Sequence, residues 1–196
     1  MGTTYEVPSF RTGVLAKALL SDWAIENVVQ AHSALPVEVV DVNVGFNGYY
    51  GDVRPDVVPG QPLYLHGPKY PGSMAFNSAA LKDPPSDPKT FAALRQGTLP
   101  RNALRGFGAA QWDLAIHRTF PIHEQLKLQF RAELFNVLNH PNFGPPSGSV
   151  TSGQFGLSSQ TLGQFLGGGN SGSGGFSPLY QIGGPRSMQF ALKLSF

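Results

Sequence analysis

Cysteine is absent from the sequence, which excludes a disulfide framework and any thiolate chemistry. Charge is scarce too: Asp, Glu, Lys and Arg make up 13% of the 196 residues, about half of the ~25% found in average soluble domains. The formal net charge is only +2 and no cluster of Lys or Arg occurs, so we expect no nucleic-acid partner. No apolar run approaches the ~20 residues that a membrane-spanning helix requires.

Signals for metal, cofactor or catalytic chemistry are also lacking. The five histidines are scattered, no pair has the spacing of metal ligands on a helix, and no cysteine joins them. The stretch GGGNSGSGG is not followed by Lys-Ser or Lys-Thr, so it indicates a surface loop and not a phosphate-binding loop. We therefore predict no metal, no cofactor, no catalytic residue and no enzymatic activity. The first residues, MGTTYEVPSFRTGVLAKALL, lack the basic start and apolar core of a signal peptide.

Glycine and proline are abundant instead. The 24 glycines and 17 prolines form about a fifth of the chain against an average of ~12%, which favours short strands joined by long loops. Four segments alternate between apolar and polar residues, as expected where successive side chains point to opposite faces of a sheet. A helix over Leu126–Asn139 is the main alternative there, because Ala, Leu, Glu and Arg are good helix formers. The predicted strands are Trp23–Val37, Trp112–Phe120, Leu126–Leu138 and Ser187–Phe196.

The connections between these strands differ greatly in length. Only a few residues join the second and third predicted strands, whereas long loops are expected at about 41–110 and 144–185. Transmembrane barrels alternate short periplasmic turns with long extracellular loops in this way. We therefore predict an all-β fold of antiparallel strands, forming one domain over residues 1–196.

The short connection restricts how the second and third strands can pair. Paired residues share a face of the sheet, so the numbers of paired residues sum to an even value. Phe120 then faces either Glu124 or Leu126, which places Asp113 opposite Arg131 in the first register and opposite Glu133 in the second. In both registers one face of the hairpin is polar, and in a barrel this face would line the lumen. The predicted lumen-facing polar residues are Asp113, His117, Arg131, Glu133 and Lys193.

Two environments fit the apolar face of these strands. It could line the core of a soluble or secreted β-sandwich that acts as a binding module, or it could face lipid on the outside of a barrel. Long charged residues in mid-strand, such as Lys127 and Arg131, are typical of strands that border a wet lumen. Aromatic residues near strand ends, such as Trp112 and Phe120, are typical of the girdles at membrane interfaces. Both features favour the barrel.

Two longer strings carry a family resemblance. The first is RNALRGFGAAQWDLAIHRTFPIHEQLKLQFRAELFNVLNHPNFG and the second is GGPRSMQFALKLSF. Together they resemble the C-terminal end of TonB-dependent outer-membrane receptors, in particular the Oar-like group with a carboxypeptidase-regulatory-like domain. The resemblance extends from about Leu15 to Phe196. It implies the last strands of a large barrel of about 22 strands, filled by a plug, which takes up ligands with energy passed through the plug by TonB.

The resemblance also implies a location and a set of partners. The expected location is the outer membrane, and the expected partners are outer-membrane lipid and the barrel-assembly machinery. TonB would act only through a plug domain that this chain lacks, so we expect no transport by the chain alone. The family's barrels end in an alternating strand that closes on an aromatic residue, and the assembly machinery reads this signal. The residues that match the signal are Phe190, Leu192, Leu194 and Phe196.

Overall fold

The computed structural model describes residues 1–8, 21–46, 49–50, 52–123, 126–166 and 183–196. The chain divides into two compact units. The sheet unit comprises Met1–His32, Ala110–Pro141 and Ser177–Phe196, and the loop unit comprises Ser33–Ala109 and Asn142–Phe176. In the described part of the chain, no helix has the length and apolar character needed to cross a membrane.

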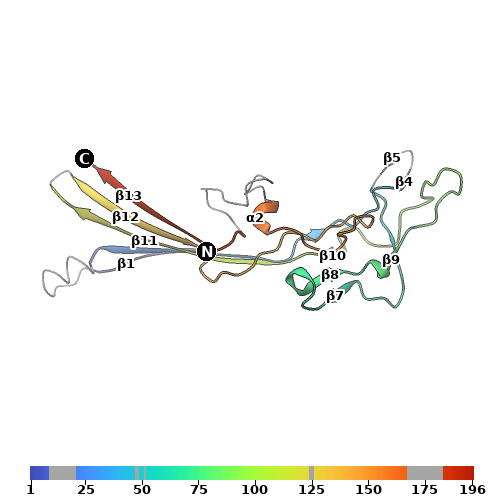
Figure 1. Cartoon of the computed structure of the whole chain (residues 1–196), viewed down its shortest axis with the longest axis horizontal. Helices are drawn as coiled ribbons and strands as arrows, with labels where there is room; N and C mark the ends of the chain where they lie inside the picture. The colour runs from blue at the N-terminus through green and yellow to red at the C-terminus, as the bar shows by residue number, and fades with distance from the viewer. Residues whose placement is uncertain (9–20, 47–48, 51, 124–125, 167–182) are drawn as a thin grey trace. The chain divides into compact units, whose positions relative to one another are not determined.

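The sheet unit contains one five-stranded sheet with the strand order β1-β2-β11-β12-β13 (Figure 1). The pairs β1–β2, β11–β12 and β12–β13 are antiparallel. This confirms the predicted fold class, and a strand occupies the segment for which a helix was the alternative. The strands are β1 (Gly2–Glu6), β2 (Trp23–His32), β11 (Ala109–Pro121), β12 (Lys127–Phe135) and β13 (Ser187–Ser195).

The β11–β12 hairpin has the predicted parity but neither of the two predicted registers. Phe120 pairs with Leu128, two residues beyond the later of the expected partners. The shift arises because β11 continues to Pro121, which pairs with Lys127. Asp113 therefore lies opposite neither Arg131 nor Glu133. Because the sum of paired numbers stays even, each residue keeps the face that the sequence pattern gave it.

Two predicted strands end earlier than expected. The first ends at His32, and β3 (Pro36–Val37) pairs with a different strand in the loop unit. The third ends at Phe135, because Asn136 and Asn139 have φ values of 50° and 51°, in the left-handed region that strands do not use. The strand β1 was not predicted, because its sequence GTTYE has little alternation to reveal it.

The loop unit is more ordered than the expected long loops. The buried side chains of Val37, Val39, Phe76, Leu99 and Leu104 form an apolar core. The unit also contains short antiparallel ladders, the 3-10 helices η1 (Pro71–Ser73) and η2 (Ser78–Ala80) and the helix α2 (Leu162–Phe165). The ladders pair β3 with β10 (Leu104–Arg105), β4 (Gly45–Phe46) with β5 (Tyr49–Tyr50), β6 (Asp56–Val57) with β9 (Leu81–Lys82), and β7 (Tyr64–His66) with β8 (Met74–Phe76).

The core explains why these segments do not behave as simple loops. Leu99 is 2% exposed and Leu104 is 1% exposed, and burying such side chains is worth roughly 1.5–3 kcal/mol each. The segment from 142 to 166 packs against the first segment through Val150 and Phe155. The glycine-rich stretch predicted as a surface loop lies outside the described residues.

Candidate functional site

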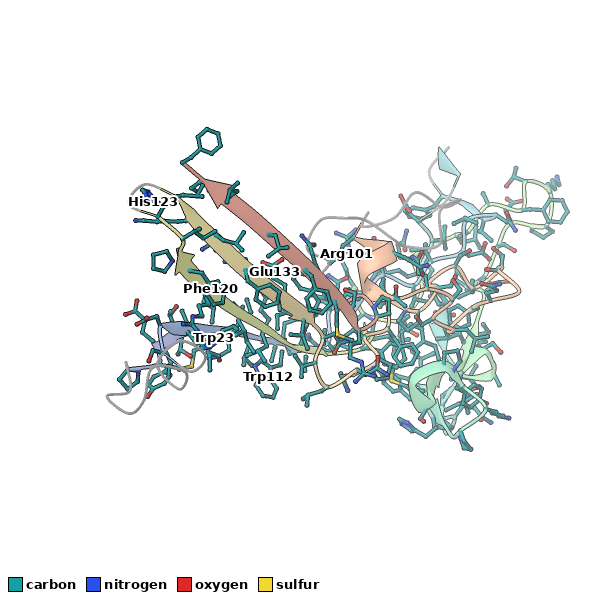
Figure 2. All side chains as sticks on the ribbon, turned by 60° about the vertical axis from the view of Figure 1, so that its left-hand side comes forward. Trp23, Arg101, Trp112, Phe120, His123 and Glu133 are labelled. Atoms are coloured by element: carbon teal, nitrogen blue, oxygen red, sulfur yellow. The ribbon has the colours of Figure 1, made fainter. Side chains whose placement is uncertain are left out.

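The sheet has one apolar face, built from the even-numbered residues of β11, β12 and β13. The register pairs Phe130 with Leu192 and Ala132 with Phe190, and the rings of Phe130 and Phe190 stack at 6.4 Å between centroids. Phe190 is 69% exposed and Leu192 is 70% exposed. Large apolar side chains are thus left uncovered across a continuous part of this face (Figure 2).

Arg118 interrupts the apolar face. It lies opposite Phe130 in the register, and its residue is only 6% exposed. Its guanidinium carbon lies 4.5 Å from the ring centroid of Phe120 and 5.7 Å from that of Trp23. The Nε and Nη1 atoms of Arg118 have no hydrogen-bond partner among the described residues. Arg118 is the exception in the alternation of β11, because the other even-numbered residues from Trp112 to Phe120 are apolar.

The opposite face carries a network of charged side chains. Arg131 Nε donates to Glu133 Oε1 at 2.7 Å, and Arg131 Nη2 donates to Glu26 Oε2 at 3.1 Å. His117 pairs with Arg131 across the hairpin, and its Nδ1 lies 3.6 Å from Glu26 Oε1. The structure thus brings together three of the predicted polar residues around a glutamate of β2. Lys193 shares their face, since it pairs with Gln129.

Sequence reasoning missed Glu26 as a member of this network. Glu26 is on the polar parity of its strand, as the alternation of β2 indicates. No hairpin turn joins β2 to β11, because residues 33–108 intervene. A sequence pattern therefore could not show which residues of β11 and β12 lie beside Glu26.

Asp113 has the parity of this face but lies apart from the network, because neither predicted pairing, with Arg131 or with Glu133, forms. Its carboxylate accepts hydrogen bonds from Gln111 Nε2 at 2.8 Å and from the backbone N–H of Asn136 at 2.8 Å. Gln111 Oε1 in turn accepts from the backbone N–H of Gly183 at 2.6 Å. Because the register is shifted, Asp113 holds the start of β11 to the end of β12 instead of pairing with a cation.

Asn136 completes this buried junction. Its side-chain amide donates to the carbonyl oxygens of His140 and Gly184 at 2.9 and 3.0 Å, and its Oδ1 accepts from the His140 N–H at 3.0 Å. Asn136 is 2% exposed, so each of these bonds replaces one that water would otherwise supply. The arrangement is structural, because its hydrogen bonds join three chain segments.

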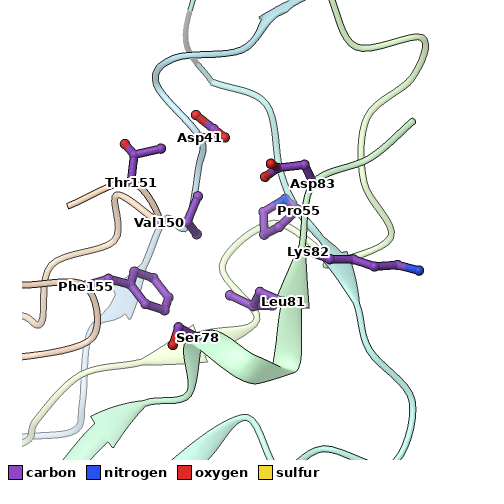
Figure 3. Close-up of a pocket in the computed structure, with 9 residues that line it drawn as sticks. All are labelled: Asp41, Pro55, Ser78, Leu81, Lys82, Asp83, Val150, Thr151 and Phe155. Atoms are coloured by element: carbon purple, nitrogen blue, oxygen red, sulfur yellow. The ribbon is translucent and has the colours of Figure 1, made fainter. Parts of the chain in front are cut away.

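The loop unit contains a cavity of about 350 Å³ (Figure 3). The carboxylates of Asp41 and Asp83 lie on the same side of it (Figure 3). Burial and the neighbouring carboxylate of Asp41 raise the pKa of Asp83. In the part of the chain that the structure describes, no group of three or more His, Cys, Asp or Glu side chains is arranged to hold a metal ion. The lining residues are Asp41, Pro55, Ser78, Leu81, Lys82, Asp83, Val150, Thr151 and Phe155.

An ion pair stabilises the loop unit close to its core. Arg95 donates from Nη1 and Nη2 to the two carboxylate oxygens of Asp56, at 2.7 and 2.8 Å. Asp56 Oδ1 also accepts from the backbone N–H of Thr98 at 2.9 Å. The hydrogen bonds from Arg95 are the main cause that lowers the pKa of Asp56 to about 2. A bidentate pair of this kind fixes both side chains and joins two distant parts of the segment.

Comparison with known proteins gives one family match. The model of a family described as an outer membrane beta barrel domain matches residues 1–167. No curated protein matches the chain. No solved structure matches it either.

Proposed function

The chain belongs to the family of outer membrane β-barrel domains, and we propose that its five-stranded sheet forms part of the wall of a transport barrel. In this proposal the even-numbered residues of β11–β13 face lipid and the odd-numbered residues face a water-filled lumen. The family gives the outer membrane as the location of the protein.

The difference between the two faces of the sheet is the observation that supports this orientation. One face leaves Phe190 and Leu192 mostly exposed, as lipid contact requires. The other face places Glu26, Arg131 and Glu133 within hydrogen-bond distance of one another. Barrel walls alternate apolar outward residues with polar inward residues in this manner. Paired charges suit a wet lumen, because water solvates their remaining polar atoms.

We further propose that the barrel is that of a TonB-dependent receptor. The two strings that resemble this receptor class contain β11, β12 and β13 and the hairpin between the first two. Ligand uptake is proposed for the complete receptor with its plug, and not for this chain alone. The proposed partners are outer-membrane lipid, the barrel-assembly machinery and, through the plug, TonB. No enzymatic activity is proposed.

Fractionation of the bacterium that carries the gene tests whether the protein is an outer-membrane barrel. An antibody raised against the loop unit would detect the native protein in outer-membrane, periplasmic and secreted fractions. We expect the outer-membrane fraction, with a shift in electrophoretic mobility on boiling, as closed barrels show. Recovery of the native protein in a soluble fraction would overturn the barrel and support the β-sandwich binding module.

Retention on an immobilised periplasmic domain of TonB tests whether the barrel is that of a TonB-dependent receptor. The detergent extract of the outer membrane is the sample, and a general porin in the same extract is the control. We expect the complete receptor with its plug to be retained and the porin to pass through. A complete receptor that is in the outer membrane but passes through with the porin would overturn TonB dependence and leave the barrel assignment intact.

A further inference from the structure

Arg118 is a buried cation, and two of its three donor nitrogens lack an acceptor in the described part of the chain. Its Nε and Nη1 atoms make no hydrogen bond among the described residues, and the residue is 6% exposed. Arg95 and Arg131, by contrast, each donate to a carboxylate at 2.7 Å. Removing a cation from water costs several kcal/mol unless an anion or acceptor compensates. The neighbouring strands therefore leave Arg118 without the acceptor that its burial requires.

No strand of the sheet can provide an anion on the same face. Four acidic residues lie in the described strands of this sheet, and all of them fall on the polar face. Asp113 and Glu133 have the odd parity of that face on β11 and β12, and Glu26 bonds to Arg131 there. Glu6 pairs with Ala24, which has the same parity as Glu26. The partner of Arg118 must therefore come from outside the strands.

Aromatic rings surround the guanidinium. Phe120 and Trp23 lie at 4.5 and 5.7 Å from its carbon. Phe130 lies opposite Arg118 in the register and meets Trp23 edge to face at 6.3 Å between centroids. Such rings stabilise a cation by cation–π contact, but Nε and Nη1 stay buried without an acceptor among the residues that the structure describes. The rings also form an apolar surface on which a hydrocarbon chain can lie.

The position along the strand indicates which anion is available. Arg118 lies three residues before Pro121, the last residue of β11, which is about 10 Å along a strand. Trp23 is the first residue of β2 and Phe120 the last but one of β11. Aromatic girdles near strand ends mark the membrane interface of barrels. The long stem of Arg lets its guanidinium reach headgroup level while the methylene groups stay on apolar surface.

We propose that Arg118, with Trp23 and Phe120, forms a binding site for the phosphate of a glycerophospholipid headgroup. The inference rests on the proposed orientation of the sheet in the membrane. Guanidinium groups donate to phosphate oxygens, and Nε and Nη1, which lie on different edges of the group, are two donors without a hydrogen-bond partner among the described residues. Both atoms are buried, so the phosphate would reach them only where the ring of Trp23 or Phe120 moves aside. The acyl chains of the lipid would pack along the neighbouring apolar residues Leu128 and Phe130, which lie on the same face.

Tryptophan quenching by brominated lipids tests the site. The full chain carrying Trp112→Phe retains Trp23 as its tryptophan, next to Arg118, and is placed in dodecyl maltoside micelles. Brominated phosphatidylglycerol is titrated in, and brominated diacylglycerol with the same acyl chains serves as the phosphate-free probe. We expect Arg118→Gln to raise the half-quenching concentration of phosphatidylglycerol about tenfold. The response to diacylglycerol should not change.

Further variants control for charge and for folding. Lys127→Gln removes one positive charge near the same end of the hairpin, but on the polar face, and should leave both titrations unchanged. Arg118→Lys keeps the charge on a single donor nitrogen and should give an intermediate value. Each variant must keep the β-sheet circular dichroism of the parent, and Arg118→Lys serves as the reporter if Arg118→Gln does not fold.

The outcomes separate the possible failures. Equal phosphatidylglycerol titrations for the parent, Arg118→Gln and Arg118→Lys chains, with normal quenching by both lipids, would overturn the headgroup site alone. No quenching by either lipid in any variant would show that this face is not in the apolar phase, and would overturn the proposed orientation too. Displacement of phosphatidylglycerol by millimolar inorganic phosphate would overturn the lipid as the source of the anion.

Discussion

At the scale of single residues, Asp113 shows how a carboxylate can hold a strand junction without a cation. It accepts from the side chain of Gln111 and from the backbone of Asn136 in a buried setting. Both donors would lose this acceptor if the carboxylate were removed. An unsatisfied buried donor costs more than the bond itself contributes.

Replacement of Asp113 with alanine should therefore destabilise the sheet unit. We expect the free energy of unfolding to fall by about 1–3 kcal/mol, measured by urea unfolding of the full chain in detergent micelles. Thr119→Ala is the matched control, because Thr119 is exposed on the same face of the same strand. A loss no larger than that of the control would show that the junction does not depend on Asp113.

The Asp56–Arg95 pair gives the loop unit a predictable response to acid. The pKa of Asp56 is lowered from 3.8 to about 2, so the folded state favours the charged carboxylate. This stabilisation is complete above pH 3.8 and is lost as the pH falls toward 2. The pKa of Asp87 is also lowered, by backbone N–H donors, and acts in the same direction. The raised pKa of Asp83 acts in the opposite direction.

Cleavage by pepsin between about pH 4 and pH 2 measures this response. We expect cleavage within the loop unit to become faster as the pH falls, and Asp56→Asn to be cleaved faster than the parent at the upper end of this range. The two chains should converge at the lower end, where the pKa of Asp56, about 2, leaves its carboxyl half protonated. Measurement of both chains at each pH corrects for the pH dependence of pepsin itself. Parallel curves that stay equally far apart would contradict the assignment of the acid response to Asp56.

At the scale of elements, close backbone approaches join the segments of the loop unit. The Val40 N–H donates to the Gly148 carbonyl, and the Val150 N–H donates to the Val40 carbonyl, both at 3.0 Å. A Cβ atom at Gly148 would collide with the carbonyl oxygen of Glu38. The clash is with backbone, which cannot move aside as a flexible side chain can. Only glycine fits this crossing.

Gly148→Ala should accordingly separate the two segments of the loop unit. We expect a loss of about 1–3 kcal/mol in local stability, seen as faster hydrogen exchange of the Val40 and Val150 amides. Gly153→Ala is the control, since no atom lies within 4 Å of the added Cβ and its φ is not in the left-handed region. Unchanged exchange of the Val40 amide in Gly148→Ala would be the contradicting result.

The elements also show how far the sequence could predict this fold. Alternation located β11, β12 and β13 and the parity of their pairing, because the two-residue period of a strand is a local property. It did not give the register, which depends on where the turn between Phe120 and Lys127 closes. It did not give the end of β2 or the core of the loop unit either, because these depend on contacts between distant segments.

In the candidate site, too, local alternation predicted the face of a residue but not its contacts with distant segments. His117, Arg131 and Glu133 were placed on one face from parity alone, and the structure brings them together. Glu26 could not be added, because the pairing of β2 with β11 spans a long insertion. Asp113 was given the wrong neighbours, because a shift of two residues keeps the face but changes the partner. The aromatic surroundings of Arg118 could not be predicted either, because they include Trp23 of β2, whose place beside β11 the sequence pattern does not show.

At the scale of the whole molecule, the proposed orientation in the membrane is open to a paired test on β13. Leu192→Arg would place a charge on the lipid face. If the site lies near the bilayer midplane, this charge should destabilise the folded chain in vesicles by about 2–4 kcal/mol. Gln189→Arg, on the same strand, places the same charge opposite Glu133 and should have little effect. Urea-dependent folding of the full chain into vesicles supplies the measurement. Equal costs for the two variants would contradict the assignment of faces.

The shared core of the loop unit has a consequence for how such a protein can change over generations. Val37 and Leu104 come from the first long insertion, while Val150 and Phe155, which pack against that core, come from the second. Phe76 and Phe155 meet across the two insertions at 6.1 Å between ring centroids. A recombination event that replaced one of these segments would bring together core residues that were never selected to pack against each other. We therefore expect related genes to exchange the two insertions together, as one heritable cassette.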